Sequence, residues 1–371
     1  MIQDFKRNEY LKSGRLIIVS NRLPLSFKRL EDENWRVFPS TGGLVTAITS
    51  VLERQEGIWI GWPGTQEIVD IESIMGRSSI KLGYNIKPVR LDEAEINQYY
   101  MGFSNEVLWP LFHDIQTGCN FNPAYWDMYR AVNRKFARQI AYIVEKDDYI
   151  WVHDYHLLMV AHELRMLDIK NNIGFFLHIP FPSPDMYMKL PWRMDILRAM
   201  VEYDLVGFQT MRDRNNFVHC VDKLAKGHSA DIRRNITVIR TADKRTKVGS
   251  FPISIDFNEF ARQAITHRVS DKARRLRLAS PNRKIILGLD RLDYSKGIPD
   301  RLRAIGNALE RYQCLVGKIT MVQVVVPSRE DVSGYNTLRE EIERIASNVN
   351  GRYTQPGWVP IHYMYRSLER D

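Results

Sequence analysis

Cationic side chains follow apolar runs of this chain in short loops, where a charge can meet an anionic ligand. Arg22 comes after the run 15–20, and Arg291 and Lys296 share one loop of sequence RLDYSKG. A guanidinium suits bidentate phosphate binding, and two cations on a loop that enters a helix could neutralise a leaving diphosphate. Arg329 follows a later apolar run. The position of Arg22 is equally typical of an ordinary surface arginine.

Asp154 and His178 also lie where an apolar run ends, so both are candidates for direct chemistry. Asp154 could orient sugar hydroxyls or act as a base. His178 enters a loop of sequence HIPFPSP, which its three prolines stiffen, although a lone histidine is as often a structural residue. His153 and His156 flank Asp154 but lack a third ligand at helical spacing, so we expect no metal site.

Paired glycines and clustered aromatic residues suggest contacts with a diphosphate and with sugar rings. Gly42 and Gly43 precede a helical pattern, and paired glycines let backbone N–H groups approach a diphosphate. Trp62, Tyr100 and Trp109 offer aromatic faces to a sugar, and a tyrosine hydroxyl can reach a phosphate. A plain tight turn explains the glycines as well, and a helix packed into the core explains the aromatic residues.

Alternating strands and helices must position these residues. Short apolar, β-branched runs lie at 15–20, 57–62, 149–153, 174–178, 205–208 and 236–239. Helix-length patterns separate them, for example at 157–165 and 212–224. Such alternation predicts an α/β fold with a parallel sheet covered on both faces.

A second, shorter series of the same kind begins after residue 256. It has strands at 284–289 and 318–326 and helices near 300–311 and 337–348. We therefore expect two Rossmann-like domains, 1–254 and 255–371, hinged near 252–258, with ligands bound in the cleft at the carboxyl ends of their sheets. The chain ends on a helix-like pattern at 363–368, and two or three strands make a poor core. We therefore expect the second domain to be incomplete and the sequence to be truncated or naturally short.

The composition limits the class of protein. The chain has 371 residues, 44% of them hydrophobic and 26% charged, which is typical of a globular protein. The net charge of +9 is spread along the chain, no nucleic-acid-binding module is recognisable, and no apolar run approaches the roughly 18 residues of a membrane span. Three distant cysteines and a polar N-terminus favour a cytoplasmic protein without disulfides.

Taken together, the motifs resemble those of the trehalose-6-phosphate synthase family, which are retaining glycosyltransferases of the GT-B fold. In chain order these motifs are SNR, GGL, YY with FSN and LWP, WVHDYHLL, GFFLHIPFPSP, YDLVGFQT, RLDYSKG, PSREDV and PGWVP. The resemblance covers nearly all of residues 15–360.

The resemblance assigns roles to the residues that match the family's motifs. It implies that glucose 6-phosphate, the acceptor, is bound by Arg22, Trp62, Tyr100, Trp109, Asp154 and Arg329. It implies that the donor, a nucleoside diphosphate glucose and by family default UDP-glucose, is bound by Gly42, Gly43, His178, Arg291 and Lys296.

The resemblance also implies the mechanism. The acceptor 1-hydroxyl would attack from the face that the diphosphate leaves, giving α,α-trehalose 6-phosphate with retention. No carboxylate nucleophile is evident, so the leaving phosphate oxygen would take the acceptor proton. Arg291 and Lys296 would stabilise the growing phosphate charge, with Asp154 and His178 as further catalytic residues. No cofactor or metal would be needed, since the two cations replace a divalent ion.

Several alternatives stay open. A relative that glucosylates glycerol 3-phosphate would share the phosphate pocket, although the sugar-ring contacts of the acceptor set favour glucose 6-phosphate. A non-catalytic phosphosugar-binding protein would not need Arg291 and Lys296. The sequence ends before the family's DGMNLVAKE block and before a C-terminal helix that crosses back onto the first domain, so we expect weakened donor binding. The donor base and a homo-oligomeric state are left open.

Overall fold

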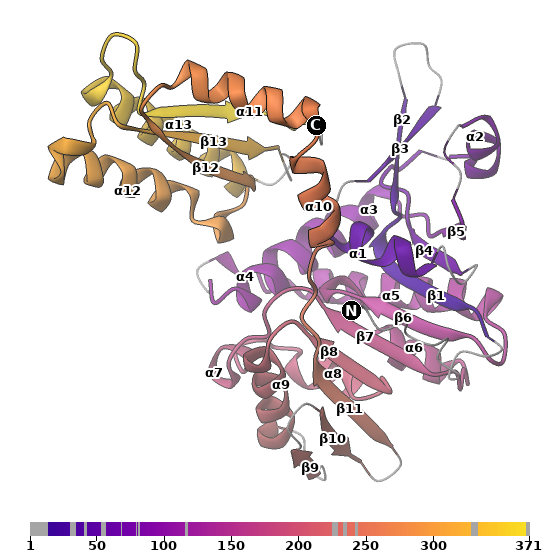
Figure 1. The fold of residues 1–371 in the computed structure, drawn as a ribbon. Coiled ribbons are helices and arrows are strands. Elements are labelled where there is room, and N and C mark those ends of the chain that lie inside the picture. The colour runs from indigo at the N-terminus through magenta and orange to yellow at the C-terminus, as the bar shows by residue number, and fades with distance from the viewer. Residues whose placement is uncertain are drawn as a thin grey trace. The chain divides into compact units, whose positions relative to one another are not determined.

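The computed structural model describes residues 14–29, 35–40, 43–52, 57–67, 69–78, 80, 82–115, 118–224, 229–232, 236–241, 244–327 and 333–368 (Figure 1). The chain divides into two compact units, Met1–Ile255 (unit 1) and Asp256–Asp371 (unit 2).

Unit 1 is built around a sheet of order β5-β4-β1-β6-β7-β8-β11-β10-β9. Its strands are β1 (Leu16–Arg22), β4 (Ile58–Trp62), β5 (Asn85–Pro88), β6 (Tyr149–His153), β7 (Ile173–Leu177), β8 (Leu205–Phe208), β9 (Ser229–Ile232), β10 (Ile236–Arg240) and β11 (Arg245–Ser250). In this sheet order, each strand from β5 to β11 is parallel to the next one. Every side chain of β4 and β7 is buried, as expected of strands covered on both faces. The predicted α/β fold is confirmed.

One strand of this sheet departs from the prediction of a parallel arrangement. The run at 236–239 forms β10, which pairs antiparallel with both β11 and β9. The segment between β10 and β11 is too short for a crossover helix, so the two strands can only form a hairpin.

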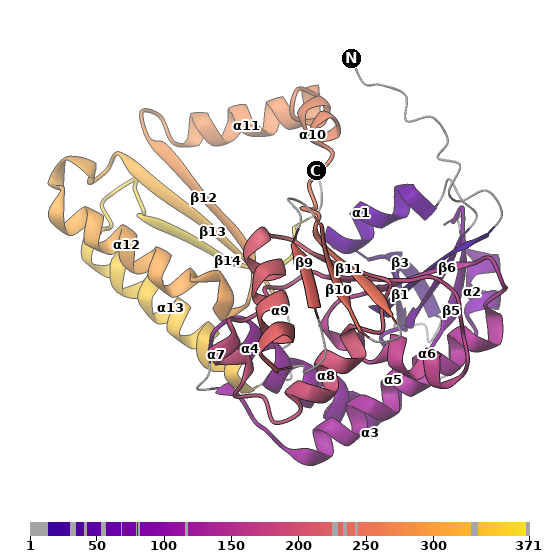
Figure 2. The same cartoon turned by 90° about the horizontal axis from the view of Figure 1, so that it is seen from below.

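Helices lie on both faces of the unit 1 sheet. They are α1 (Gly43–Leu52), α2 (Ile71–Arg77), α3 (Glu93–Glu95), the π-helix η2 (Ile96–Leu108), α4 (Trp109–Phe112), α5 (Pro123–Ile143), the 3₁₀ turn η4 (Tyr155–Leu157), α6 (Val160–Met166), α7 (Pro184–Tyr187), α8 (Arg193–Met200) and α9 (Met211–Leu224). Figure 2 shows α1 on one side of the strands and α5 and α8 on the other.

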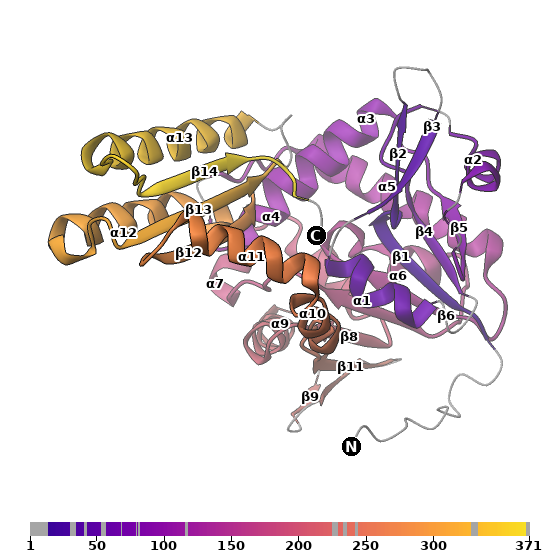
Figure 3. The ribbon, with the colours of Figure 1, turned by 45° about the horizontal axis from the view of Figure 1, so that its top comes forward.

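A β-hairpin extends unit 1 beyond the main sheet. Its strands β2 (Leu25–Arg29) and β3 (Trp35–Pro39) pair antiparallel. Figure 3 shows the hairpin grouped with α2 at the β5 edge of the sheet. Leu25 and Phe27 of the hairpin are buried in one cluster with Trp59 of β4 and Ile71 of α2, so the hairpin shares the core of unit 1.

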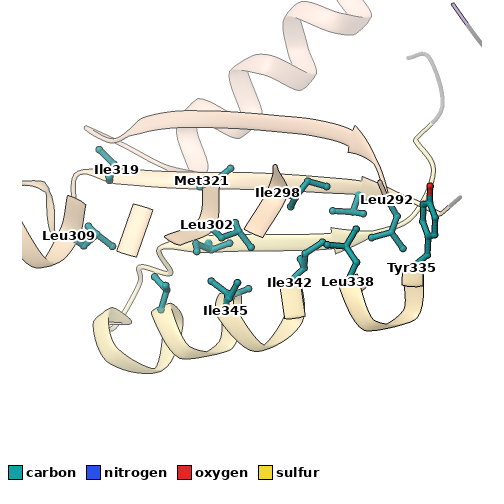
Figure 4. Packing of buried hydrophobic residues seen from close by; sticks show 14 of the residues in the cluster. Leu292, Ile298, Leu302, Leu309, Ile319, Met321, Tyr335, Leu338, Ile342 and Ile345 are labelled. Atoms are coloured by element: carbon teal, nitrogen blue, oxygen red, sulfur yellow. The ribbon is translucent and has the colours of Figure 1, made fainter. Parts of the chain in front are cut away.

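Unit 2 contains a smaller parallel sheet of order β12-β13-β14. Its elements are α10 (Phe257–Ala264), α11 (His267–Ala279), β12 (Lys284–Arg291), the 3₁₀ turn η5 (Tyr294–Lys296), α12 (Ile298–Arg311), the 3₁₀ turn η6 (Gln313–Leu315), β13 (Ile319–Val326), α13 (Ser333–Tyr353) and β14 (Ile361–Tyr365). Figure 4 shows Ile298, Leu302, Ile342 and Ile345 of α12 and α13 packed against Met321 of β13. Unit 2 therefore has a hydrophobic core of its own.

The last strand corrects the sequence interpretation of a helix-like pattern at 363–368. Residues 361–365 form β14, which pairs with β13. Ile361, Tyr363 and Tyr365 all pack on the unit 2 core, which is the two-residue period of a strand. The helical spacing of neighbouring apolar residues was therefore misleading. No helix among the described residues is long and apolar enough to cross a membrane.

Candidate active site

Arg22, Trp62 and Tyr100 come together at the ends of two adjacent strands. Arg22 ends β1 and is paired in register with Trp62 at the end of β4. The guanidinium carbon of Arg22 lies 4.0 Å from the centroid of the Trp62 ring and 5.7 Å from that of Tyr100. Such contacts hold a cation by about 0.5–1 kcal/mol at exposed sites. The residue remains exposed, so an oriented positive charge is available to an anion.

The turn after β4 leaves room for this arginine. Gly64 has a φ of +90°, and a Cβ there would stand 1.9 Å from Nη1 of Arg22. The indole N–H of Trp62 donates to the Thr65 carbonyl at 3.0 Å and fixes the ring. Gly64 therefore takes part in the site, although it was not among the residues predicted from the sequence. In the sequence, a Pro-Gly pair signals only a turn.

A row of rings continues from Tyr100 to Trp109. The His156 ring stacks on the Tyr100 ring, with their centroids 5.8 Å apart. The centroid of the Tyr155 ring lies 3.9 Å from that of His156, and the centroid of the Trp109 ring lies 5.6 Å from that of Tyr155. From the sequence, His156 was a candidate only as a metal ligand, because stacking between separate segments leaves no spacing signal. Trp109 is buried, so its ring also serves the core.

Asp154 has a strained backbone. Its φ of 73° and ψ of 167° fall in a region that is essentially restricted to glycine and costs other residues about 1–3 kcal/mol. Two contacts hold it there: its N–H donates to the Phe176 carbonyl at 2.8 Å, and its carboxylate accepts the His178 N–H at 3.2 Å. Strain of this kind concentrates at functional sites.

Helix α5 holds the turn that follows Asp154. The hydroxyl of Tyr129 donates to the Tyr155 carbonyl at 2.8 Å and accepts the Leu158 N–H at 3.1 Å. Asn133 donates to the His156 carbonyl at 3.1 Å. Both side chains are fully buried, so the turn rests on a rigid support.

The π-helix η2 is tied to the same turn through Asn105. Its side-chain amide donates to the Tyr100 carbonyl at 2.7 Å and accepts the Tyr155 hydroxyl at 3.1 Å. At the other end of this helix the Tyr99 hydroxyl donates to the side chain of Asn21, next to Arg22, at 3.0 Å. One element therefore links Arg22, Tyr100 and the turn after Asp154. Long π-helices are rare and have no sequence signature that we could have used.

His178 lies directly beyond β7 and close to His153. Their rings meet through Nδ1 of His153 and Nε2 of His178, 3.0 Å apart. Burial lowers the pKa of His153 well below its ordinary value, and His178 lowers it further. Burial also lowers the pKa of His178, against the opposing effect of the Asp154 carboxylate. Both imidazoles are therefore neutral at pH 7.

The loop after His178 is anchored to α9. The Phe181 N–H donates to the Asp213 carboxylate at 3.2 Å, and the Asn216 amide donates to the Phe181 carbonyl at 2.9 Å. Phe181 itself is buried. The prolines alone do not fix this loop, and its partners lie too far along the chain to be found from spacing.

In unit 2, Arg291 ends β12 and Lys296 lies in η5, and both are exposed. The buried Asp293 shapes the loop between them by accepting the Ser295 N–H at 2.9 Å. Gly297 then turns the chain into α12 with a φ of +60°. Arg301 of α12, which the sequence analysis missed, donates to Asp290 at 2.7 Å and to the Lys296 carbonyl at 3.3 Å. The loop thus presents two cations from a fixed backbone.

The remaining predicted residues are placed only in part. Gly43 is the exposed first residue of α1, and a Cβ there would meet no described atom within 4 Å. Gly42 and Arg329 lie outside the described residues. Within the described ranges, no three His, Cys, Asp or Glu side chains are grouped so as to hold a metal ion.

Known proteins are similar to this chain in sequence and fold. Residues 14–371 match glycosyltransferase family 20. A trehalose-6-phosphate synthase of Mycolicibacterium smegmatis is 39% identical over 360 residues, 96% of this chain and 70% of the relative. A UDP-forming α,α-trehalose-phosphate synthase of Dictyostelium discoideum is 36% identical over 362 residues, 98% of this chain and 48% of the relative.

Solved structures agree with these matches. A UDP-forming α,α-trehalose-phosphate synthase of Burkholderia xenovorans, in complex with glucose 6-phosphate, superposes with a TM-score of 0.85 at 32% identity, over 96% of this chain and 75% of that one. An E. coli protein bound with UDP-2-fluoro glucose superposes with a TM-score of 0.83 at 35% identity, over 96% of this chain and 74% of that one. The family match spans nearly the whole sequence, and the resemblance inferred from the motifs is confirmed: the chain belongs to glycosyltransferase family 20.

Proposed function

We propose that this protein transfers glucose from UDP-glucose to glucose 6-phosphate and forms α,α-trehalose 6-phosphate with retention. The observation that carries the proposal is the exposed guanidinium of Arg22 held over Trp62 and Tyr100. A fixed cation beside aromatic rings suits a phosphorylated sugar better than a free sugar or a free anion. Relatives named trehalose-6-phosphate synthase support the same substrate pair.

In unit 1, Arg22 and Tyr100 bind the acceptor phosphate, and Trp62 and Trp109 line the sugar pocket. Asp154 accepts hydrogen bonds from acceptor hydroxyls, and its strained backbone fixes the direction of the carboxylate. Arg329 is proposed as a second phosphate ligand on the strength of its motif alone.

On the donor side, Arg291 and Lys296 bind the diphosphate, His178 binds the donor glucose, and Gly42 and Gly43 let the backbone approach the nucleotide sugar. As the acceptor 1-oxygen bonds to the anomeric carbon, the bond from that carbon to the diphosphate oxygen breaks. The departing phosphate oxygen takes the acceptor proton on the same face. The two cations stabilise the charge that develops there, each by a few kcal/mol, about 2.7–4 for a typical preorganised donor, and no metal takes part.

The test is an assay of UDP release by the purified chain, with the disaccharide product identified by NMR. We expect glucose 6-phosphate to be glucosylated, free glucose to react at least about a thousandfold more slowly, and the product to show α,α linkage. Glycerol 3-phosphate serves as the competing acceptor, because it offers the phosphate without a ring for Trp62 and Tyr100. Equal rates with free glucose, or a preference for glycerol 3-phosphate, would refute the acceptor assignment.

A further inference from the structure

The surroundings of His153 decide which of the two rings donates the hydrogen bond between His153 and His178. His153 is 1% exposed, and its Nε2 atom is buried with no hydrogen-bond partner among the described residues. Its Nδ1 atom lies 3.0 Å from Nε2 of His178. Since both rings are neutral, each carries one N–H, and one proton lies in the shared hydrogen bond.

Two arrangements of the protons are available. If His178 donated, His153 would have to carry its own proton on Nε2 and bury an N–H without an acceptor. If His153 donates from Nδ1, only a lone pair is left unpaired at its Nε2. Among buried backbone groups, unpaired N–H donors are rarer than under-satisfied acceptors, and the same preference applied to imidazole selects the second arrangement.

We propose that His153 is a positioning residue that donates from Nδ1 to Nε2 of His178 and thereby fixes the tautomer and the ring orientation of His178. His178 then carries its proton on Nδ1, which leaves that N–H as the donor it can offer to a sugar oxygen. Its backbone is held separately, because its N–H donates to the Asp154 carboxylate at 3.2 Å. The strand end of β6 therefore fixes both the ring and the backbone of His178. The importance of this arrangement for turnover rests on the proposed function.

Three substitutions of His153 separate positioning from folding. In His153→Asn the amide nitrogen takes the place of Nδ1 and can still donate, whereas His153→Gln places its amide nearer the position of Nε2. His153→Phe keeps a ring of similar size without any donor. We expect only His153→Asn to retain the wild-type state of His178. The Asn and Gln variants carry the same chemical group, so a difference between them cannot come from polarity alone.

The direct readout is the ¹⁵N spectrum of the purified chain, labelled at histidine and assigned by His178→Gln. We expect the wild type and His153→Asn to show His178 protonated on Nδ1, and His153→Gln and His153→Phe to show the Nε2–H form or a mixture. If His178 carries its proton on Nε2 in the wild type, or keeps the same tautomer in all three variants, the proposal is wrong.

The second readout is UDP release with glucose 6-phosphate. We expect kcat to fall about tenfold or more in His153→Gln and His153→Phe, with KM for glucose 6-phosphate unchanged and kcat largely retained in His153→Asn, by analogy with outer partners that orient metal-binding histidines. An equal loss in all three variants would mean a structural role only. If the wild type transfers no glucose while the tautomers follow the expected pattern, the proposed function fails and the pairing stands.

Discussion

In the proposed function, Arg22 is the described residue that reads the acceptor phosphate. Arg22→Ala removes the exposed guanidinium from Trp62 and Tyr100, and we expect KM for glucose 6-phosphate to rise about 10- to 100-fold, as for a lost hydrogen bond to a charged group. Arg22→Lys should be intermediate, because lysine keeps the charge but loses the planar fork. Steady-state kinetics with glucose as the control acceptor checks this. If the variants lose as much with glucose as with glucose 6-phosphate, Arg22 does not read the phosphate.

At Asp154, substitutions can separate the strain of the backbone from the role of the carboxylate. Asp154→Ala and Asp154→Gly both lose the carboxylate, but only glycine adopts a φ of 73° and ψ of 167° without strain. After the extra flexibility of unfolded glycine is subtracted, we expect Asp154→Gly to be more stable than Asp154→Ala by about 1 kcal/mol. Urea unfolding measures the difference, and both variants should be severely impaired in transfer. An Ala variant as stable as the Gly variant would mean that the backbone there is not strained.

The buried histidine pair should make stability depend on pH. Both pKa values are lowered in the folded protein, whereas in the unfolded chain each is about 6.5. Below that pH the unfolded chain binds protons that the folded chain does not, so the free energy of unfolding falls as the pH falls from 7 to 5. One histidine that stays neutral contributes up to about 1.4 kcal/mol per pH unit below its unfolded pKa.

His153→Asn removes one of the two titrating groups and serves as the comparison. Urea unfolding at pH 7 and pH 5 should show that the wild type loses about 1–2 kcal/mol more than this variant over the interval. Equal losses would show that His153 accepts a proton in the folded protein as readily as in the unfolded chain.

At the scale of elements, the side chain of Asn105 stabilises η2 and ties it to the turn after Asp154. Asn105→Ala removes the amide that donates to the Tyr100 carbonyl and accepts from the Tyr155 hydroxyl, so both of these hydrogen bonds are lost. We expect a loss of about 1–3 kcal/mol in stability and a raised KM for glucose 6-phosphate, because Tyr100 shifts with the helix. Thermal unfolding and kinetics measure the two effects.

The neighbouring Ser104 provides a matched control for Asn105. Its hydroxyl is buried and has no hydrogen-bond partner in the described part of the chain. Ser104→Ala should therefore be neutral or slightly stabilising and should leave KM unchanged. If Ser104→Ala is as harmful as Asn105→Ala, the sensitivity belongs to packing around η2 rather than to the Asn105 hydrogen bonds.

The sequence predicted the elements whose periodicity is local and failed where a tertiary contact decides. The runs at 149–153 and 205–208 are the strands β6 and β8, because short apolar runs with β-branched and aromatic residues between polar loops favour strands. The strand ends then placed Arg22, Asp154 and His178 correctly at one edge of a sheet. The sequence could not show η2, because a long π-helix has no sequence signature. It also could not show the support from Tyr129 and Asn133 or the contact between His156 and Tyr100, because these join segments far apart in the chain.

At the scale of the whole molecule, each unit has a core that does not depend on the other. Leu16, Ile18 and Trp59 belong to a cluster within unit 1, and Leu302, Met321 and Ile342 belong to one within unit 2. Of the proposed acceptor ligands, all but Arg329 lie in unit 1, whereas the diphosphate ligands Arg291 and Lys296 lie in unit 2. Binding of glucose 6-phosphate alone should therefore leave its mark mainly on unit 1, and binding of UDP alone should mark the loop 291–297 of unit 2.

Hydrogen exchange with each ligand separately tests this division. Glucose 6-phosphate at about a hundredfold excess over its Kd should slow exchange in η2 and around Asp154 by up to about a hundredfold, equivalent to about 2.7 kcal/mol, and leave residues 291–297 unchanged. UDP should protect residues 291–297 and leave η2 unchanged. Free glucose is the control for the first ligand and should protect neither region. Protection of 291–297 by glucose 6-phosphate alone, or of η2 by UDP alone, would show that the substrates are not divided between the units in this way.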